Sequence, residues 1–177
     1  NTRSTESLKS PVEELHKRLP APSLGISTQT GQLQRVSMPL LVSGLSDEPL
    51  AILRDALSPY GIAVMSGGGS SPNPVAQRAF EPGSAIAVDL VRGDVTMQSI
   101  GTVTAIDGYR VLAFGHPMLN AGETYFPVST AEVTTFMPSL VSSFKFGHSL
   151  LPAGVLIQDR TAGIIADTTQ AAQTLPM

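Results

Sequence analysis

The histidines are the residues of this chain whose types and spacing best suit chemistry. The sequence contains no cysteine, which excludes disulfides, thiolate catalysis and cysteine-ligated zinc sites. His16 lies among charged residues near the N-terminus and is interpreted as a solvated side chain. His116 and His148 each follow a glycine, and only His116 is also followed by a proline. His116 is therefore the candidate catalytic residue.

The segment around His116 has the sequence LAFGHPML over residues 112–119. Pro117 disfavours the helical region for the residue before it, so the backbone of His116 is predicted to be extended. Gly115 has no side chain, so another segment or a substrate can approach the backbone there. An imidazole held in this way suits a general base. The alternative is a hydrogen-bonded core histidine at the end of a strand, an interpretation that applies still more to His148.

A complete hydrolase or metal site is not evident from local sequence. Residues 67–71 (GGGSS) are small, but they lack the strand and helix signals that flank a nucleophile elbow. Ser149 adjoins His148, and neighbours in an extended segment point to opposite faces. The set His116, His148 and Glu123 has no spacing that supports a metal site. Phosphate-binding glycine motifs are absent from the sequence. We therefore expect neither a metal nor a cofactor.

The composition of the chain narrows the classes of partner and fold. Charged residues make up 14% of the 177 residues, against roughly 25% in an average soluble protein, and the net charge is −3. Nucleic acids and anionic membranes are bound through clustered Lys and Arg, so neither is expected as a partner. No run approaches the roughly 20 apolar residues of a transmembrane helix. With 16 glycines and 14 prolines, the sequence favours a mainly β protein of the α+β type.

The predicted elements divide the chain into three parts. Residues 1–35 are expected to form a short amphipathic helix over 7–19 and an extended connector. Residues 36–79 are expected to form a small strand–helix–strand unit, in which Ser46 caps the helix and Pro59 and Gly61 end it. This unit finishes in a linker rich in Gly, Ser and Pro. Residues 80–177 are expected to form a β-barrel or sandwich, because short strands recur about every 8 to 12 residues.

Turn chemistry sets the expected strands of this last part. Asp107-Gly108 is a strong hairpin signal, and Gly101 predicts a bulge or bend within its strand. The expected strands are 85–91, 95–106, 109–114, 125–135, 142–146, 153–157 and 163–166.

A low density of charge marks the middle of this β-rich part. Between Val111 and Gln158 the only charged residues are Glu123, Glu132 and Lys145. Strands so poor in charge are expected to be covered on both sides. The cover is either the protein's own core or an interface with another domain or subunit.

Three segments, taken in order, resemble the peptidase domain of the SpoIVB serine peptidases (family S-55). They are IGTVT at 100–104, LAFGHP at 112–117 and QDRTAGI at 158–164, and the resemblance covers roughly residues 80–167. The closest similarity is to the bacterial branch with a Phe-Gly-His-Pro motif. The resemblance implies a trypsin-like antiparallel β-barrel and an endopeptidase with a Ser-His-Asp triad. It places the general base at His116.

The other two triad members have no counterpart in this chain. The family nucleophile lies in a Gly-Met-Ser-Gly-Ser-Pro motif with the triad Asp shortly before it, and neither is present. Asp159 matches the Asp-Arg segment and not the triad Asp. The nucleophilic Ser and the Asp are therefore expected outside this chain, upstream of Asn1 in the same domain or in a second copy. The chain by itself is expected to be inactive.

The resemblance also implies a protein or peptide substrate and a location outside the cytoplasm, secreted or in the cell envelope. The alternative function is a non-catalytic, β-rich protein-interaction module of a secreted or envelope protein. A carbohydrate- or lipid-binding barrel is a third interpretation. It is disfavoured because six Phe, three Tyr and no Trp leave few stacking platforms for sugars.

Overall fold

The computed structural model describes residues 38–67, 69, 79–138 and 144–175, and these residues are mainly β. Strands account for 59% of them and helical turns for 11%, which confirms the predicted α+β class with β predominating. The helix predicted over 7–19 and the connector after it lie outside the described residues. None of the described helices has the length and apolar run needed to cross a membrane.

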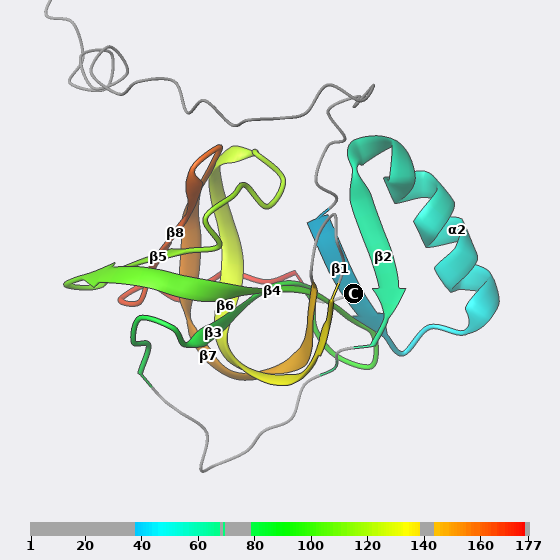
Figure 1. Cartoon of the computed structure of the whole chain (residues 1–177), viewed down its shortest axis with the longest axis horizontal. Coiled ribbons are helices and arrows are strands. Elements are labelled where there is room, and N and C mark those ends of the chain that lie inside the picture. Colours follow the sequence, from blue (N-terminus) through cyan, green and yellow to red (C-terminus); the bar gives the residue numbers. More distant parts are fainter. Residues whose placement is uncertain (1–37, 68, 70–78, 139–143, 176–177) are drawn as a thin grey trace, which may run out of the picture. The chain divides into compact units, whose positions relative to one another are not determined.

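Eight strands form one sheet, part of which closes into a ring (Figure 1). The order is β2-β1-β4-β3-β6-β7-β8-β5, and β5 also pairs with β4. Strands β4, β3, β6, β7, β8 and β5 therefore make a closed antiparallel ring, from which β1 and β2 extend beyond β4. The bounds are β1 Met38–Ser43, β2 Ile62–Ser66, β3 Ala85–Val91, β4 Thr96–Asp107, β5 Arg110–Ala113, β6 Gly122–Met137, β7 Phe144–Arg160 and β8 Gly163–Asp167.

The interior of the ring is aliphatic. Alternate side chains of the strands point inward, as the pleat of a strand requires. Ile86, Val88, Val128 and Leu156 are fully buried there, and Met118 from the loop after β5 joins them. This core holds the ends of β5 and β6 in place, and the loop that carries His116 runs between those ends.

The single α-helix of the described residues, α2 (Asp47–Leu57), covers the β1–β2 pair. Leu50 is buried against the aliphatic side chains of β1 and β2. Ser46 occupies the N-cap position, but its side chain makes no capping hydrogen bond, and the two acidic residues of the first turn provide the favourable charge there. A short 3-10 turn (Ser58–Tyr60) follows and ends at Gly61, whose φ of 73° is left-handed, as the predicted helix stop requires.

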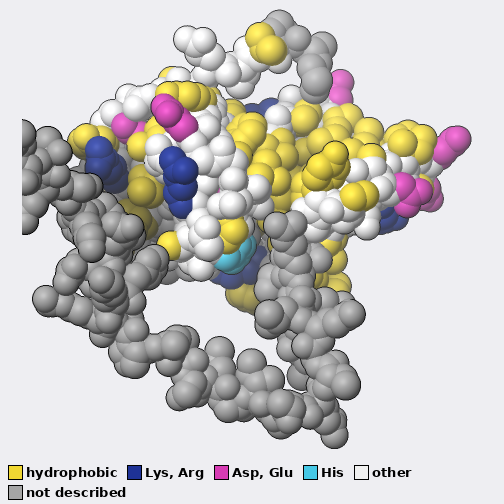
Figure 2. Space-filling model, turned by 90° about the horizontal axis from the view of Figure 1, so that it is seen from above, with side chains coloured by type: hydrophobic (Ala, Val, Ile, Leu, Met, Phe, Trp, Pro, Cys, Tyr) yellow, Lys and Arg dark blue, Asp and Glu magenta, His cyan; other side chains and the backbone are white. Residues whose placement is uncertain are grey.

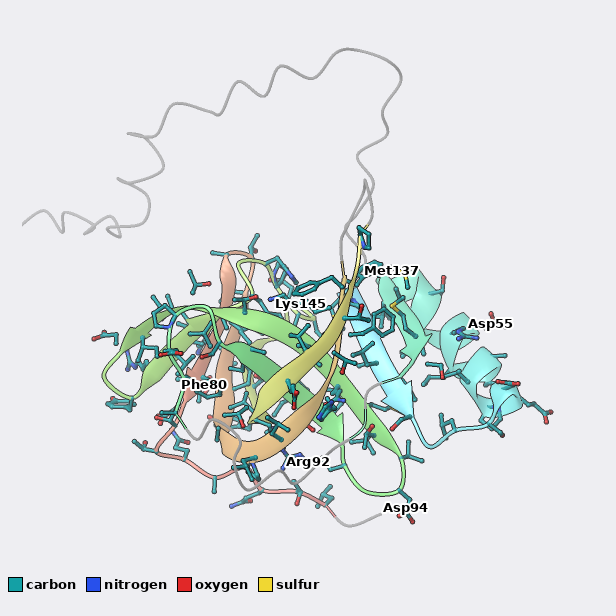
Figure 3. All side chains as sticks on the ribbon, turned by 60° about the horizontal axis from the view of Figure 1, so that its bottom comes forward. Asp55, Phe80, Arg92, Asp94, Met137 and Lys145 are labelled. Atoms are coloured by element: carbon teal, nitrogen blue, oxygen red, sulfur yellow. The ribbon has the colours of Figure 1, made fainter. Side chains whose placement is uncertain are left out.

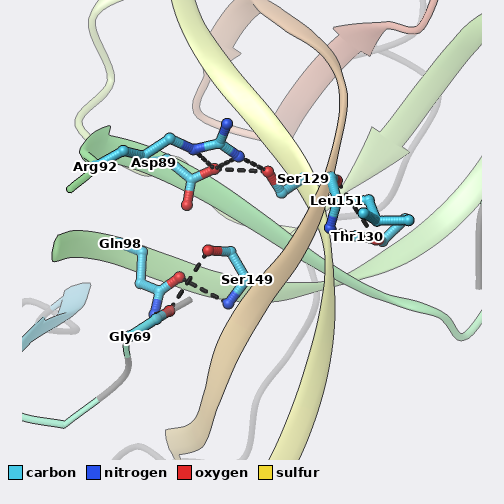
Figure 4. A network of polar contacts seen from close by, with 8 residues as sticks. All are labelled: Gly69, Asp89, Arg92, Gln98, Ser129, Thr130, Ser149 and Leu151. Carbon is cyan, nitrogen blue, oxygen red and sulfur yellow. Dashed lines mark hydrogen bonds and ion pairs between the residues drawn. The ribbon is translucent and has the colours of Figure 1, made fainter. Parts of the chain in front are cut away.

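The strand–helix–strand unit predicted over 36–79 joins the same sheet as the ring strands. Strand β1 pairs with β4 through Leu41–Ser43, opposite Gln98–Thr96. The amide of Gln98 is fully buried: it donates to the Gly69 carbonyl at 2.8 Å and accepts from the Ser149 N–H at 3.0 Å (Figure 4). Because every polar atom of this amide lies near a partner, the contact fixes the chain after β2 against β7.

A second buried polar cluster holds β3 to β6. The carboxylate of Asp89 is 2% exposed and accepts a hydrogen bond from Ser129 at 2.7 Å (Figure 4). Arg92 lies 2.6 Å from the same carboxylate and also donates to Ser129. The buried negative charge is thus paired, as burial demands. The partners of the Asp89 carboxylate, Arg92 and Ser129, belong to the same cluster. We therefore interpret the cluster as a structural contact between β3 and β6.

Two of the sequence predictions on strands are corrected by the structure. Residues 142–146 and 153–157 were expected as separate strands, but β7 runs unbroken from Phe144 to Arg160. Pro152 pairs with Ser129 and Gly154 with Val128, and the register shifts between these pairs. A bulge accommodates the proline without ending the strand. The Asp107-Gly108 hairpin is confirmed, with Asp107 paired to Arg110 across the turn.

The charge-poor stretch between Val111 and Gln158 is only partly covered. Val128, Val155 and Leu156 belong to the core, whereas Tyr125 and Phe136 are 63% and 64% exposed. The stretch therefore contributes both core and exposed apolar surface. On the face drawn in Figure 2, hydrophobic side chains gather mainly toward the side that carries α2, with most of the visible acidic side chains toward the edges.

Candidate functional site

His116 lies in the loop between β5 and β6, and a sharp reversal begins this loop. Phe114 and Gly115 have φ angles of 73° and 72°, both left-handed. The N–H of Gly115 donates to the carbonyl of Ala113 at 3.0 Å. A Cβ at Gly115 would meet nothing within 4 Å, so the position needs glycine for its backbone angle. The backbone of Gly115 is approached from another side by β8, since a Cβ at Gly163 would lie 3.4 Å from the Gly115 nitrogen, so another segment does come close there as expected.

A side chain packs closely against Gly101. The ring of Phe114 lies against Gly101, where a Cβ would overlap the ring carbons. Gly101 pairs in register with Ile86, and the irregular part of β4 lies between Val103 and Ala105. The predicted bulge at Gly101 is therefore wrong. Glycine leaves room there for an aromatic ring, which in turn stacks at a tilt on His116, with 5.6 Å between ring centroids.

Substituting Gly101 with alanine is expected to lower the free energy of unfolding by about 2–3 kcal/mol, because the added methyl group displaces the Phe114 ring. Phe114→Ala removes the obstacle, so the double variant is expected to be no less stable than Phe114→Ala alone. Urea denaturation of the three variants measures this coupling. Additive losses would contradict the contact.

The far end of the same loop is held by a buried carboxylate. Asp159 of β7 is fully buried and accepts three backbone N–H bonds, from Met118 at 2.8 Å, Leu119 at 2.7 Å and Ala121 at 3.2 Å. Three donors converging on one side chain fix the path of the loop. Asp159 is thus a positioning residue for the loop that carries His116. The sequence placed it in a matched motif but gave no sign of this role.

A groove of about 770 Å³ opens beside the loop. It lies where β1 and β5 leave a gap on the edge of β4 that faces away from β3. Strand β1 pairs with β4 only through Thr96–Gln98, and β5 pairs with it only from Val103 onward. The β4 residues Ser99 to Thr102 line the groove between these segments. Ser99 to Gly101 have no strand partner on that edge, and the Thr102 carbonyl accepts the N–H of Phe114 just beyond β5.

The His116 side chain is exposed in the wall of this groove. Its Nδ1 lies 2.9 Å from the carbonyl oxygen of Pro117. A carbonyl only accepts, so Nδ1 carries a hydrogen, and in the neutral ring Nε2 then presents a lone pair. Among the described residues, Nε2 has no hydrogen-bond partner. The ring is thus oriented and holds a free basic nitrogen, which is the state in which a histidine accepts a proton.

Lys145 lines the same groove from the start of β7. Its Nζ donates to the hydroxyl of Thr102 on β4, and burial lowers the pKa of the ammonium. Figure 3 shows Lys145 near Met137, at one end of the β6–β7 pair. The sequence signal for Lys145 was its isolation, because no other Lys or Arg lies between Val111 and Gln158.

The remaining candidates lie apart from the groove. His148 pairs across the sheet with Glu132, and its Nε2 is 3.7 Å from that carboxylate. Ser149 is buried and its N–H is bonded to the Gln98 amide. At Gly147 a Cβ would overlap the Glu132 carbonyl, so this Gly-His pair marks a close strand contact.

The structure does not assemble the metal set considered from the sequence. Glu123 accepts a hydrogen bond from Tyr125 at 2.7 Å. Within the described ranges, no three His, Asp or Glu side chains come together to hold a metal ion. His16, Ser70 and Ser71 lie outside those ranges.

Comparisons of the chain with protein-family models, with curated proteins and with solved structures find no match.

Proposed function

We propose that this chain provides the general-base histidine of a serine endopeptidase resembling the SpoIVB peptidases. The observation that carries the proposal is the state of His116, which is exposed in a groove with Nδ1 bonded and Nε2 free. The nucleophilic Ser and the triad Asp come from outside these residues, in the same domain or a second copy. The protein acts on peptides outside the cytoplasm.

In this reaction Nε2 of His116 accepts the proton of the serine hydroxyl as the oxygen attacks the peptide carbonyl. The same nitrogen then gives that proton to the departing amine. Water attacks the acyl-enzyme by the same route, and Nε2 again takes and returns the proton. In the assembled site the triad Asp replaces the Pro117 carbonyl as the acceptor at Nδ1. The closed antiparallel ring supports this proposal, because a trypsin-like domain needs such a barrel.

Active-site labelling of the full gene product that contains this chain tests the proposal. A fluorophosphonate probe is expected to label a serine in the wild type, and His116→Ala is expected to abolish the labelling. His148→Ala is the matched control, since it also follows a glycine but lies outside the groove, and it is expected to keep the labelling. Absence of labelling in the wild type, or its persistence in His116→Ala, would overturn the proposal.

A second candidate is a non-catalytic protein-interaction module. The exposed Tyr125, Phe136 and Met137 on β6 favour it, since exposed apolar side chains on one strand suit a protein contact. The same experiment separates the two. An interaction module gives no serine labelling in any variant.

A further inference from the structure

Lys145 is a half-buried cation in a groove without a counter-charge. Among the described residues, Lys145 forms no ion pair. The described lining of the groove holds no acidic side chain, and its only ionisable groups besides Tyr60 are Lys145 and His116. The groove is therefore complementary to a negative group.

The position of the ammonium is set by the contact between two strands. Lys145 pairs with Phe136 in the β6–β7 ladder, and its Nζ reaches across to the hydroxyl of Thr102 on β4. An ammonium has three N–H donors, so two remain after this bond. Burial lowers the pKa of Lys145, because the charged form loses hydration that no anion replaces. A bound anion would supply the missing partner.

The residues that line the groove indicate which kind of anion would bind there. Ile100, Phe114, Met118 and Phe144 line the groove with apolar surface. A compact dianion such as phosphate takes several donors or an arginine fork, and the groove lining contains no arginine. A single carboxylate next to apolar groups fits better. In an extended peptide, the side chain of Asp or Glu supplies such a carboxylate.

The edge of β4 supports an extended ligand. Ser99 to Gly101 lack a strand partner on the groove side, whereas the Thr102 carbonyl already accepts the Phe114 N–H at 3.0 Å. An unpaired strand edge offers its backbone groups to an added extended segment. Lys145 donates to the hydroxyl of Thr102, the next residue along β4. An added chain would thus lie within reach of the ammonium.

We propose that the groove binds an extended peptide and that Lys145 selects an acidic side chain in it. The role as a specificity subsite rests on the proposed endopeptidase function, in which the ligand is an internal segment of a chain. The binding of the acidic side chain does not depend on that function.

Peptide binding to the 177-residue chain tests this inference without requiring catalysis. The probes are labelled, acetylated and amidated apolar hexapeptides, each with one Glu or one Gln at the same position. The Glu peptide is expected to bind at least about tenfold more tightly than its Gln counterpart, since charge-assisted bonds exceed neutral ones. Lys145→Met keeps the apolar stem and is expected to bring this ratio to about one. Lys145→Arg is expected to retain part of the preference.

Arg54→Met is the matched control, because this cation lies on α2 and donates to the Val64 carbonyl outside the groove. It should leave the ratio unchanged. No peptide binding, equal binding of Glu and Gln peptides, or a preference that survives Lys145→Met would overturn the inference. Tighter binding of a Gln peptide with a free C-terminus, or displacement by millimolar phosphate, would overturn the assignment to a side chain. A Glu preference without serine labelling would uphold the site and reject the peptidase.

Discussion

Replacing His116 with alanine is expected to lower kcat/KM for peptide hydrolysis by the full gene product by about 10⁴-fold or more. Without Nε2, the groove lining that the structure describes has no other imidazole to take the proton of the attacking hydroxyl, so the nucleophile stays protonated. Binding of the peptide depends on other residues. The loss should therefore fall mainly on kcat, and steady-state kinetics with a fluorogenic peptide measures it.

The same variant should fold normally, because His116 is exposed, its ring packs at a tilt on that of Phe114, and its hydrogen bond is to the adjacent Pro117 carbonyl. A change in unfolding free energy within about 0.5 kcal/mol is expected, as for other exposed positions. His148→Ala should retain its activity. Hydrolysis that survives in His116→Ala would place the base elsewhere, whatever the labelling shows.

Asp159→Ala is expected to lower the free energy of unfolding by about 3–4 kcal/mol. The substitution removes a fully buried acceptor and leaves the N–H groups of Met118, Leu119 and Ala121 without a partner. The loop that carries His116 loses its anchor at the same time. Denaturant unfolding gives the stability loss, and hydrogen exchange of the three amides reports the release of the loop.

Asp159→Asn removes the negative charge of the side chain but keeps nearly the same side-chain shape. It keeps one acceptor oxygen but turns an NH₂ group toward at least one backbone N–H, so an intermediate loss of about 2 kcal/mol is expected. Asp55→Asn is the control on the exposed surface of α2, and it should change the stability by less than about 0.5 kcal/mol. If Asp159→Ala cost less than about 1 kcal/mol, the anchoring role would be wrong.

Most of the secondary structure followed from local sequence. Strand 85–91, the helix after Ser46 and the hairpin at Asp107-Gly108 were all predicted, because apolar periodicity and turn chemistry act over a few residues. The one local prediction that failed badly was the break between 146 and 153. Pro152 lies directly before the strand expected at 153–157, and a bulge in the pairing with β6 accommodates it within β7.

For the candidate site, the sequence by itself determined the histidine and its immediate setting, with Gly115 giving the left-handed turn and Pro117 the carbonyl at Nδ1. Only the tertiary structure decided what surrounds it. Asp159 lies 41 residues from its partner Met118, and Lys145 lies 43 residues from Thr102. Such pairings depend on which strands become neighbours when the ring closes, and no local pattern of residues encodes that choice. The groove, its unpaired edge on β4 and its lone ammonium therefore emerge only in the folded chain.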